Sequence, residues 1–252
     1  MKKMLFYVLL LSVVSFFSGC DKDTQGDIDL VFKARFDAEP FVALQSYDYY
    51  DGTTVLFQRF NFYIANAKLT SEDGDVVDLF EIDFVDFDAF DTDEEIETGY
   101  VITTENIPGG KYTQLEIGLG VPPELNLTKE SDYVDTHPLG KASHYWSAWG
   151  SYIFTMINAK VDMDGDGMHD DAGLLYHAGS DPVYRTVTLP IDVTVAEESP
   201  GVINLDVNLS EMLKDGAEYI DPVAFPDTHD ISNLETANKI MDNFKNSLSV
   251  QN

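Results

Sequence analysis

Cysteine is almost missing from this chain, which has a single one, Cys20, among 252 residues. An internal disulfide is therefore excluded, and so is a metal site built on several thiolates. Basic residues are also scarce, because Lys and Arg number 15 against 45 Asp and Glu, giving a formal net charge of −30. This charge argues against nucleic acid and anionic membrane surfaces as partners. It attracts cations to the surface in general but does not indicate a particular cation-binding site.

Long hydrophobic runs are confined to the N-terminus. Two lysines precede an apolar segment at residues 4–17, which is too short to span a membrane. The sequence Phe17-Ser18-Gly19-Cys20 resembles a bacterial lipoprotein cleavage box. We therefore predict a lipoprotein signal peptide at residues 1–19 and lipidation of Cys20, with an ordinary secretory peptide as the alternative.

That leader places the protein in the bacterial cell envelope, with Cys20 as its lipid anchor in the outer membrane. The acidic residues that follow, Asp21 and Asp23, resemble signals of surface-exported lipoproteins, so an outward-facing position is the second placement considered. Residues 20–29 are polar and predict a tether, and residues 30–252 predict one domain.

Most of the domain alternates apolar and polar residues with the period of β-strands. A turn at residues 72–74 predicts a hairpin, and an acidic run at residues 86–97 predicts a solvated loop. Pro190 predicts that its strand lies at an edge or carries a bulge. Strands are predicted at residues 30–36, 55–69, 76–87, 115–121, 145–161, 174–177, 183–195 and 203–209.

The C-terminus changes to a helical period. Apolar residues recur every three or four positions from Ile231 to Leu248, and Ser232 with Glu235 forms a capping-box pattern. We therefore predict a mainly β fold, an antiparallel sandwich or barrel-like domain, that ends in an amphipathic helix with Ser232 as its N-cap.

One loop has the spacing of calcium ligands. Asp162, Asp164 and Asp166 are followed by Gly167 at the sixth position and Asp170 at the ninth, as in the first part of a calcium loop. The twelfth position is a glycine rather than glutamate, so the loop is not a complete EF-hand. Calcium that stiffens the loop and a plain acidic hairpin are both consistent with this pattern.

Histidines and tryptophans gather in one segment. Residues 137–185 hold four of the five histidines and both tryptophans. His144 and Trp146 are two positions apart on a predicted strand, so we expect them on one face. His229 precedes the predicted helix, whose dipole would keep its imidazole neutral and able to bind metal. Spacing alone leaves open whether these histidines share a site, and His169 is the expected bystander.

Seven short motifs follow one another along the chain, at residues 32–36, 39–41, Tyr47, 60–69, 144–152, 177–179 and 238–244. Together they resemble the MbnP family, bacterial extracytoplasmic copper-binding proteins named from the methanobactin system. The resemblance covers nearly the whole mature chain in order. The second tryptophan stands at 149 where the family pattern has it at 148, and the cysteine pair of many relatives has no counterpart.

The resemblance implies a mainly β fold and copper binding. It implies a site formed by His177 and His229, completed by His144 or His137 and by Trp146, the position matching a tryptophan that is oxidised in copper-binding relatives. Copper would be stored, acquired or passed to a metal-delivery or outer-membrane transport partner.

Two other functions are alternatives to copper binding. One is a calcium-stabilised surface β-sandwich that binds a glycan or protein through Tyr and Trp. The other is an enzyme, which is disfavoured because the sequence has no G-x-S-x-G and no H-E-x-x-H motif.

Overall fold

A computed structural model describes residues 24–251, so the predicted signal peptide and Cys20 lie outside the described residues. No helix within this range is long and apolar enough to cross a membrane. The strands are β1 Gln25–Phe36, β2 Glu39–Pro40, β3 Ser46–Asp48, β4 Thr54–Ser71, β5 Val76–Asp86, β6 Tyr100–Pro108, β7 Gly110–Leu119, β8 Tyr145–Trp146, β9 Ser151–Asp162, β10 Ala172–Gly179, β11 Arg185–Val195, β12 Gly201–Asn208, β13 Lys214–Asp215, β14 Glu218–Tyr219 and β15 Ser249–Gln251. The α-helices are α1 Asp93–Thr98, α2 Pro123–Asn126, α3 Leu209–Met212 and α4 Glu235–Ser247.

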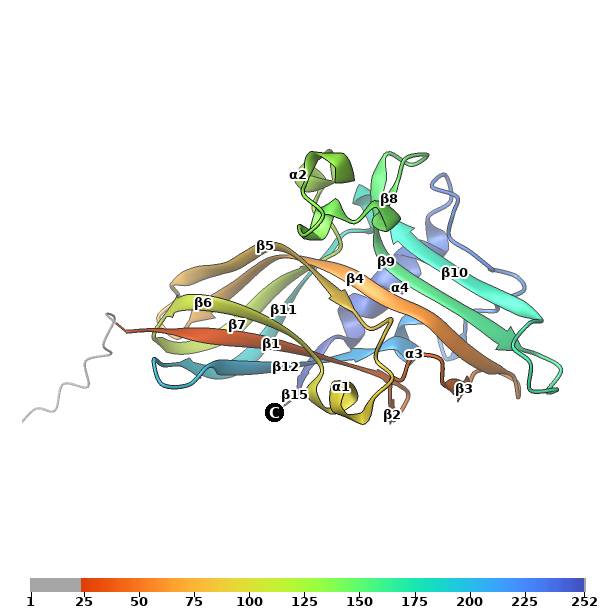
Figure 1. The fold of residues 1–252 in the computed structure, drawn as a ribbon, viewed down its shortest axis with the longest axis horizontal. Coiled ribbons are helices and arrows are strands. Elements are labelled where there is room, and N and C mark those ends of the chain that lie inside the picture. Colours follow the sequence, from red (N-terminus) through yellow and green to blue (C-terminus); the bar gives the residue numbers. More distant parts are fainter. Residues whose placement is uncertain (1–23, 252) are drawn as a thin grey trace, which may run out of the picture.

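Strands β13 and β14 form a short two-stranded ribbon. The rest of the β structure consists of two main sheets, as the mainly β prediction required (Figure 1). The larger has the order β10-β9-β4-β7-β11, with β3 and β5 also pairing with β4 and β8 with β9. The smaller has the order β15-β12-β1-β2, with β6 also pairing with β1. Pairing is antiparallel except between β1 and β12, which run parallel from Ile28↔Gly201 to Arg35↔Asn208.

The core fills the space between the sheets and α4. Aromatic residues of alternating strand positions meet there: Phe62 of β4 lies 6.1 Å from Phe32 of β1 and 4.8 Å from Phe244 of α4, centroid to centroid. Thr155 of β9 faces the same space, since its Oγ1 lies 3.3 Å from the sulfur of Met241. The inner face of β9 therefore carries residues 155 and 157, and its outer face carries Met156 and its alternating neighbours.

Helix α4 begins later than the sequence indicated. The Ser232 hydroxyl donates to Asp230 at 2.6 Å instead of accepting from a helix amide, and the N-cap is Leu234. The prediction of Ser232 as N-cap was wrong for this reason, although the amphipathic helix itself is confirmed. Its buried face consists of Ala237, Ile240, Met241 and Phe244.

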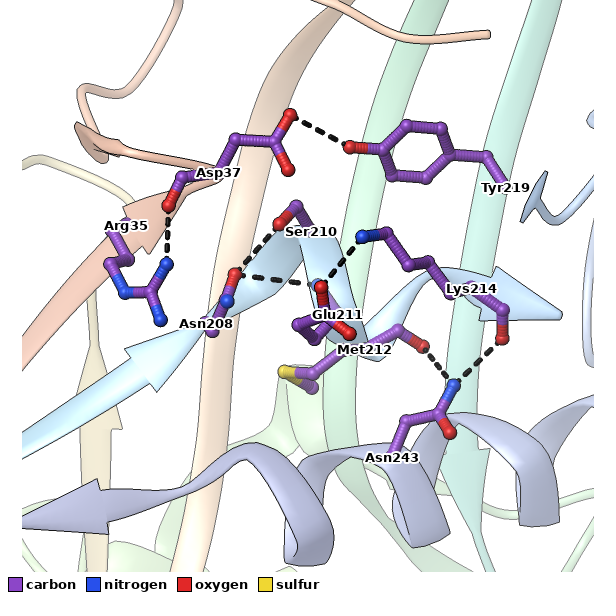
Figure 2. A network of polar contacts seen from close by, with 9 residues as sticks. All are labelled: Arg35, Asp37, Asn208, Ser210, Glu211, Met212, Lys214, Tyr219 and Asn243. Atoms are coloured by element: carbon purple, nitrogen blue, oxygen red, sulfur yellow. Dashed lines mark hydrogen bonds and ion pairs between the residues drawn. The ribbon is translucent and has the colours of Figure 1, made fainter. Parts of the chain in front are cut away.

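A polar network links α4 to α3 and β13, and β14 to the turn after β1 (Figure 2). Asn243 of α4 donates to the carbonyl oxygens of Lys214, at 2.7 Å, and Met212, at 3.4 Å. Tyr219 of β14 donates to the Asp37 carboxylate at 2.9 Å. These contacts hold α4, and with it the end of the segment that carries His229, against the rest of the fold.

A covering segment, residues 121–150, lies over the outer face of the larger sheet. In Figure 1 it is the green part, with α2 and β8, at the top of the view. Tyr63 of β4 is fully buried beneath it and donates to the carbonyl of Pro138 at 3.0 Å. The sequence did not predict this layer, because its 3₁₀ turns at residues 130–132, 138–140 and 142–144 carry no periodic apolar pattern.

Three other predictions need correction. Residues 145–161 are not one strand, because a turn at residues 147–150 separates β8 from β9 and makes them a hairpin. The acidic run contains the helix α1, whose Thr92 and Glu95 form a capping box. Strand β1 begins at Gln25 rather than Leu30, inside the predicted tether.

The bulged edge predicted from Pro190 is confirmed, since β11 ends the larger sheet and its register shifts between Pro190 and Val193.

Candidate metal centre

Two imidazoles from distant parts of the sequence meet at the outer edge of the larger sheet. His177 lies on β10, and His229 lies in the segment that leads to α4. The Nε2 atom of His229 is 3.1 Å from the Nδ1 atom of His177. Both side chains are half-buried. The edge therefore presents two ring nitrogens that face each other at hydrogen-bond distance.

The C-terminal segment reaches His177 by pairing with β10. Leu175 donates its amide to the carbonyl of Pro226 at 2.8 Å, and Leu175 and Asp227 form a parallel bridge. The amide of His177 then donates to Thr228 Oγ1 at 2.8 Å. The free edge of β10 is what brings His229 next to His177.

Asn158 of β9 determines which nitrogen of His177 is available. Its Oδ1 atom lies 2.8 Å from His177 Nε2. A carboxamide oxygen only accepts, so Nε2 carries the proton and the lone pair is on Nδ1, facing His229. This is the arrangement in which an outer-shell partner orients a metal-binding imidazole.

Burial keeps His177 neutral. Burial first, then the neighbouring His229 and the guanidinium of Arg59, lower the pKa of His177 to about 4, with Asp227 acting in the opposite direction. At neutral pH the ring is therefore uncharged, which is the form that binds a metal ion.

Two stacked indoles cover the imidazole pair. The hairpin turn at residues 147–150 places Trp149 against Trp146, with centroids 4.5 Å apart and planes at 16°. Trp146 in turn lies 4.6 Å from His229 and 6.0 Å from His177. Trp149 packs over Gly179, where an added Cβ would lie 2.9 Å from its ring.

The backbone of His229 is held on both sides. Its amide donates to Asp227 Oδ1 at 3.0 Å, and its carbonyl accepts from the indole N–H of Trp149 at 3.1 Å. The helix-dipole effect predicted for His229 has no basis in this geometry, because α4 begins at Glu235. Its position is set by Asp227 and Trp149 instead.

His144 is not on a strand with Trp146, as predicted, but ends a 3₁₀ turn one residue before β8. It is 4% exposed and packs 4.7 Å from Phe84. Its Nε2 lies 2.8 Å from Asn61 Oδ1, and its Nδ1 lies 2.9 Å from Ser143 Oγ. Both ring nitrogens of His144 therefore have polar partners.

His137 and His169 lie in other surroundings. His137 stacks 4.3 Å from Tyr133, and its Nδ1 accepts from the amide of Leu139 at 3.1 Å. His169 lies 3.0 Å from Ser46 Oγ through its Nε2. Among the predicted ligands, the structure brings His177, His229 and Trp146 together, whereas His137 has its contacts in the covering segment.

The imidazole pair fits a metal ion such as copper. Two nitrogens each about 2.0–2.1 Å from one ion at a tetrahedral angle lie about 3.3 Å apart. The observed separation is 3.1 Å. Imidazole suits copper, zinc, iron and nickel, so the donor atoms define the kind of ion but not its identity.

The acidic loop after β9 gathers a slightly different set of carboxylates from the one predicted. Oxygens of Asp162, Asp164 and Asp171 lie within 4.8 Å of one another, so Asp171 rather than Asp170 joins the first two. Asp162 accepts from the amides of Gly165, at 2.7 Å, and Gly167, at 2.9 Å. Asp166 Oδ1 accepts from the amide of Met168 at 2.8 Å. These hydrogen bonds close the loop between β9 and β10. Calcium binding by its carboxylates stays a prediction.

Fold and site together define a mainly β protein with an imidazole pair beneath two indoles. The MbnP family model matches residues 25–238, and the chain therefore belongs to the MbnP family. This family is not known as a family of enzymes. No curated protein matches the chain. MbnP from Methylosinus trichosporium is a similar solved structure, with 12% identity, a TM-score of 0.49 and coverage of 74% of this chain and 76% of that chain.

Sequence reasoning missed Asn158, Thr228 and the contacts of Trp149. A signal for Asn158 was present, because an amide in the middle of an otherwise apolar strand needs a partner when it is covered. Thr228 and Trp149 gave no such signal, because their partners belong to segments that pair only in the folded chain.

Proposed function

We propose that this protein is an extracytoplasmic copper-binding protein that holds one copper ion between His177 Nδ1 and His229 Nε2. The observation that carries the proposal is the 3.1 Å approach of these two nitrogens, one of which belongs to a ring kept neutral by burial. Membership of the MbnP family supports copper over the other ions that imidazoles bind.

Copper would take the place of the hydrogen bond between the two rings. Because His177 has its proton on Nε2, that hydrogen bond is donated by Nε2 of a neutral His229 to Nδ1 of His177. To bind the ion, His229 would move this one proton from Nε2 to Nδ1 by exchange with water, and its Nε2 would then offer a lone pair beside that of His177 Nδ1. Trp146, 4.6 Å from His229, limits water on that side. The ring of His177 stays fixed by Asn158 throughout.

Anchoring and transport complete the proposal. Lipidation at Cys20 would attach the protein to the outer membrane of a bacterium, where it would store copper, acquire it, or exchange it with a delivery or transport partner. Loss of labelled fatty acid in a Cys20→Ser variant, with release of the protein from membranes, is the expected result; a variant that stays labelled contradicts the anchor.

The binding test is competition with a chelator of known copper affinity. We expect wild type to retain copper at sub-micromolar free concentration, and His177→Ala and His229→Ala each to lose it. His169→Ala is the matched control, because that ring contacts Ser46 and Thr54 and should leave copper binding unchanged. Equal affinity in wild type and both site variants contradicts the proposal.

The second candidate is a calcium-stabilised surface domain that binds a glycan or protein. It is favoured by the carboxylate oxygens of Asp162, Asp164 and Asp171, which lie within 4.8 Å of one another. Elemental analysis distinguishes the two functions. Purified protein containing calcium and no copper after exposure to both metals supports this candidate, whereas copper at one ion per chain supports the first.

A further inference from the structure

Met156 stands directly beside His177 on the larger sheet. The two residues are paired across β9 and β10 in the antiparallel register. Residues directly opposite in such a pair point to the same face, with Cβ atoms about 4.5–5.5 Å apart. The thioether of Met156 therefore originates on the face that carries the imidazole pair.

The same row of the sheet continues to β4. Met156 is also paired with Asn61, which accepts from the ring of His144. Met156 thus lies between Asn61, which contacts His144, and His177, which contacts His229. Its sulfur is the one soft donor in a row of amide and imidazole groups.

Met156 is buried without belonging to the core. It is 5% exposed, yet it lies outside the connected hydrophobic core of the described residues. The reason is that residue 156 faces the covering segment, while Thr155 and Ile157 face the space between the sheets. Methionine is unbranched and has three rotatable bonds, so its sulfur can take up more than one position within a covered layer.

The contact of the sulfur is weak and exchangeable. Arg59 Nη1 lies 3.9 Å from Met156 Sδ, and Arg59 itself is exposed. A thioether is a poor hydrogen-bond acceptor but a good ligand for soft metal ions. Exchange of the Arg59 contact for a bond to a copper ion would therefore cost the Met156 sulfur little free energy.

We propose that the Met156 thioether is the third protein ligand of the copper bound by His177 and His229, and that it gives the site a preference for Cu(I). This inference rests on the proposed function. The sulfur donates a lone pair and releases no proton. Soft thioether ligands select Cu(I), whereas imidazoles alone also suit Cu(II), Zn(II) and Ni(II).

The experiment compares the full-length protein with Met156→Leu and Met241→Leu. Leucine conserves volume in both variants. Met241 is the matched control, because it is equally covered but contacts Thr155 on the inner face of β9. Cys20 and the other methionines are present in all three proteins, so they cannot account for a difference.

The first measurement is X-ray absorption at the copper edge of Cu(I)-loaded protein. We expect a sulfur scatterer at about 2.3 Å, the length of a metal–sulfur bond, in wild type and Met241→Leu, and its loss in Met156→Leu. The second is chelator competition, in which Met156→Leu should weaken Cu(I) binding about tenfold and leave Cu(II) binding nearly unchanged.

A shell of nitrogen and oxygen alone in wild type overturns the role of Met156, and this result does not depend on the folding of any variant. Sulfur scattering that persists in Met156→Leu overturns it as well. Either result leaves copper binding by the imidazoles intact. Failure of wild type to retain any copper contradicts the proposed function instead, so the two failures are distinguishable.

Discussion

Asn158 and His177 face each other from neighbouring strands, with Oδ1 of the amide 2.8 Å from Nε2 of the ring. This contact fixes the tautomer that leaves Nδ1 free for a metal ion. Because outer-shell partners of this kind typically change metal affinity 10–100-fold, we expect Asn158→Leu to weaken copper binding by about that factor. Asn158→Asp keeps an accepting oxygen and should retain most of the affinity. Chelator competition measures both, and equal affinities contradict the role.

Trp149 contacts His229 through its indole N–H, 3.1 Å from the carbonyl oxygen. Trp149→Phe keeps an aromatic ring against Trp146 but removes this donor. We expect faster release of copper, by about tenfold, with a smaller change in the rate of capture, because changes at a binding site alter the dissociation rate more than the association rate. Stopped-flow transfer of copper to a chelator measures the release rate. A release rate equal to that of wild type would show that the hydrogen bond is not needed.

Arg59 places a positive charge near the copper site, since its guanidinium contributes to the lowered pKa of His177. Arg59→Gln removes this repulsion and frees the sulfur of Met156. We expect roughly threefold tighter copper binding at low salt and a smaller gain at high salt, because the charge is exposed and screened. Lys160→Gln, on the exposed part of the same strand as Met156, is a charge-matched control. A gain of equal size in the control indicates a general charge effect.

His144 makes the metal-free protein sensitive to acid. Its burial, followed by electrostatic repulsion from Lys141, Arg59 and, once it is protonated, His177, lowers its pKa to about 4 from 6.5. Between these values the unfolded chain binds more protons than the folded one, so the free energy of unfolding falls as the pH drops from 6.5 towards 4. The shift corresponds to roughly 3 kcal/mol for this group.

Urea unfolding of chelator-treated protein across this window measures the effect. His144→Gln removes one of the two buried imidazoles that titrate there, so its unfolding free energy should depend less steeply on pH than that of wild type. His177, whose pKa is also about 4, contributes to the slope that remains. Identical slopes in variant and wild type contradict this account.

Asp162 closes the loop between β9 and β10. It is 4% exposed, and its carboxylate accepts from the amides of Gly165 and Gly167. Asp162→Ala leaves both donors without their partner, and we expect it to lower the free energy of unfolding by about 2 kcal/mol. Thermal unfolding with and without calcium checks this loss. A calcium-dependent rise in the wild-type midpoint that is absent in the variant supports the predicted ion; the same midpoint under all conditions contradicts the importance of the loop.

The sequence was most informative where one period dominates. Strands such as β4 and the helix α4 follow from alternation and from helical spacing, because one face of each is buried. The break between β8 and β9 was missed because aromatic residues recur on both sides of it, at Trp146, Trp149 and Tyr152, as they do along the strands. The turn itself uses Ser147 and Gly150, whose φ is 64°.

The site was predictable only in part. His177 and His229 were selected through resemblance to a family, and nothing in their spacing indicates that they meet. Their approach depends on the bridge between Leu175 and Asp227, a pairing of backbone groups that side-chain patterns do not encode. For His144 the sequence pattern was misleading. Its spacing of two residues from Trp146 suggested that both side chains lie on one face of a strand, but His144 belongs to a 3₁₀ turn and only Trp146 is in the strand.

The parallel pairing of β1 with β12 has a consequence for biogenesis. Ile28 aligns with Gly201, so the first strand has no permanent neighbour on that side until four fifths of the polypeptide has been made. Contacts this far apart in sequence fold slowly. The imidazole pair has the same dependence, because His229 reaches His177 only when the segment near Asp227 pairs with β10. Under the proposed function, copper could therefore be bound only after about nine tenths of the chain has been made.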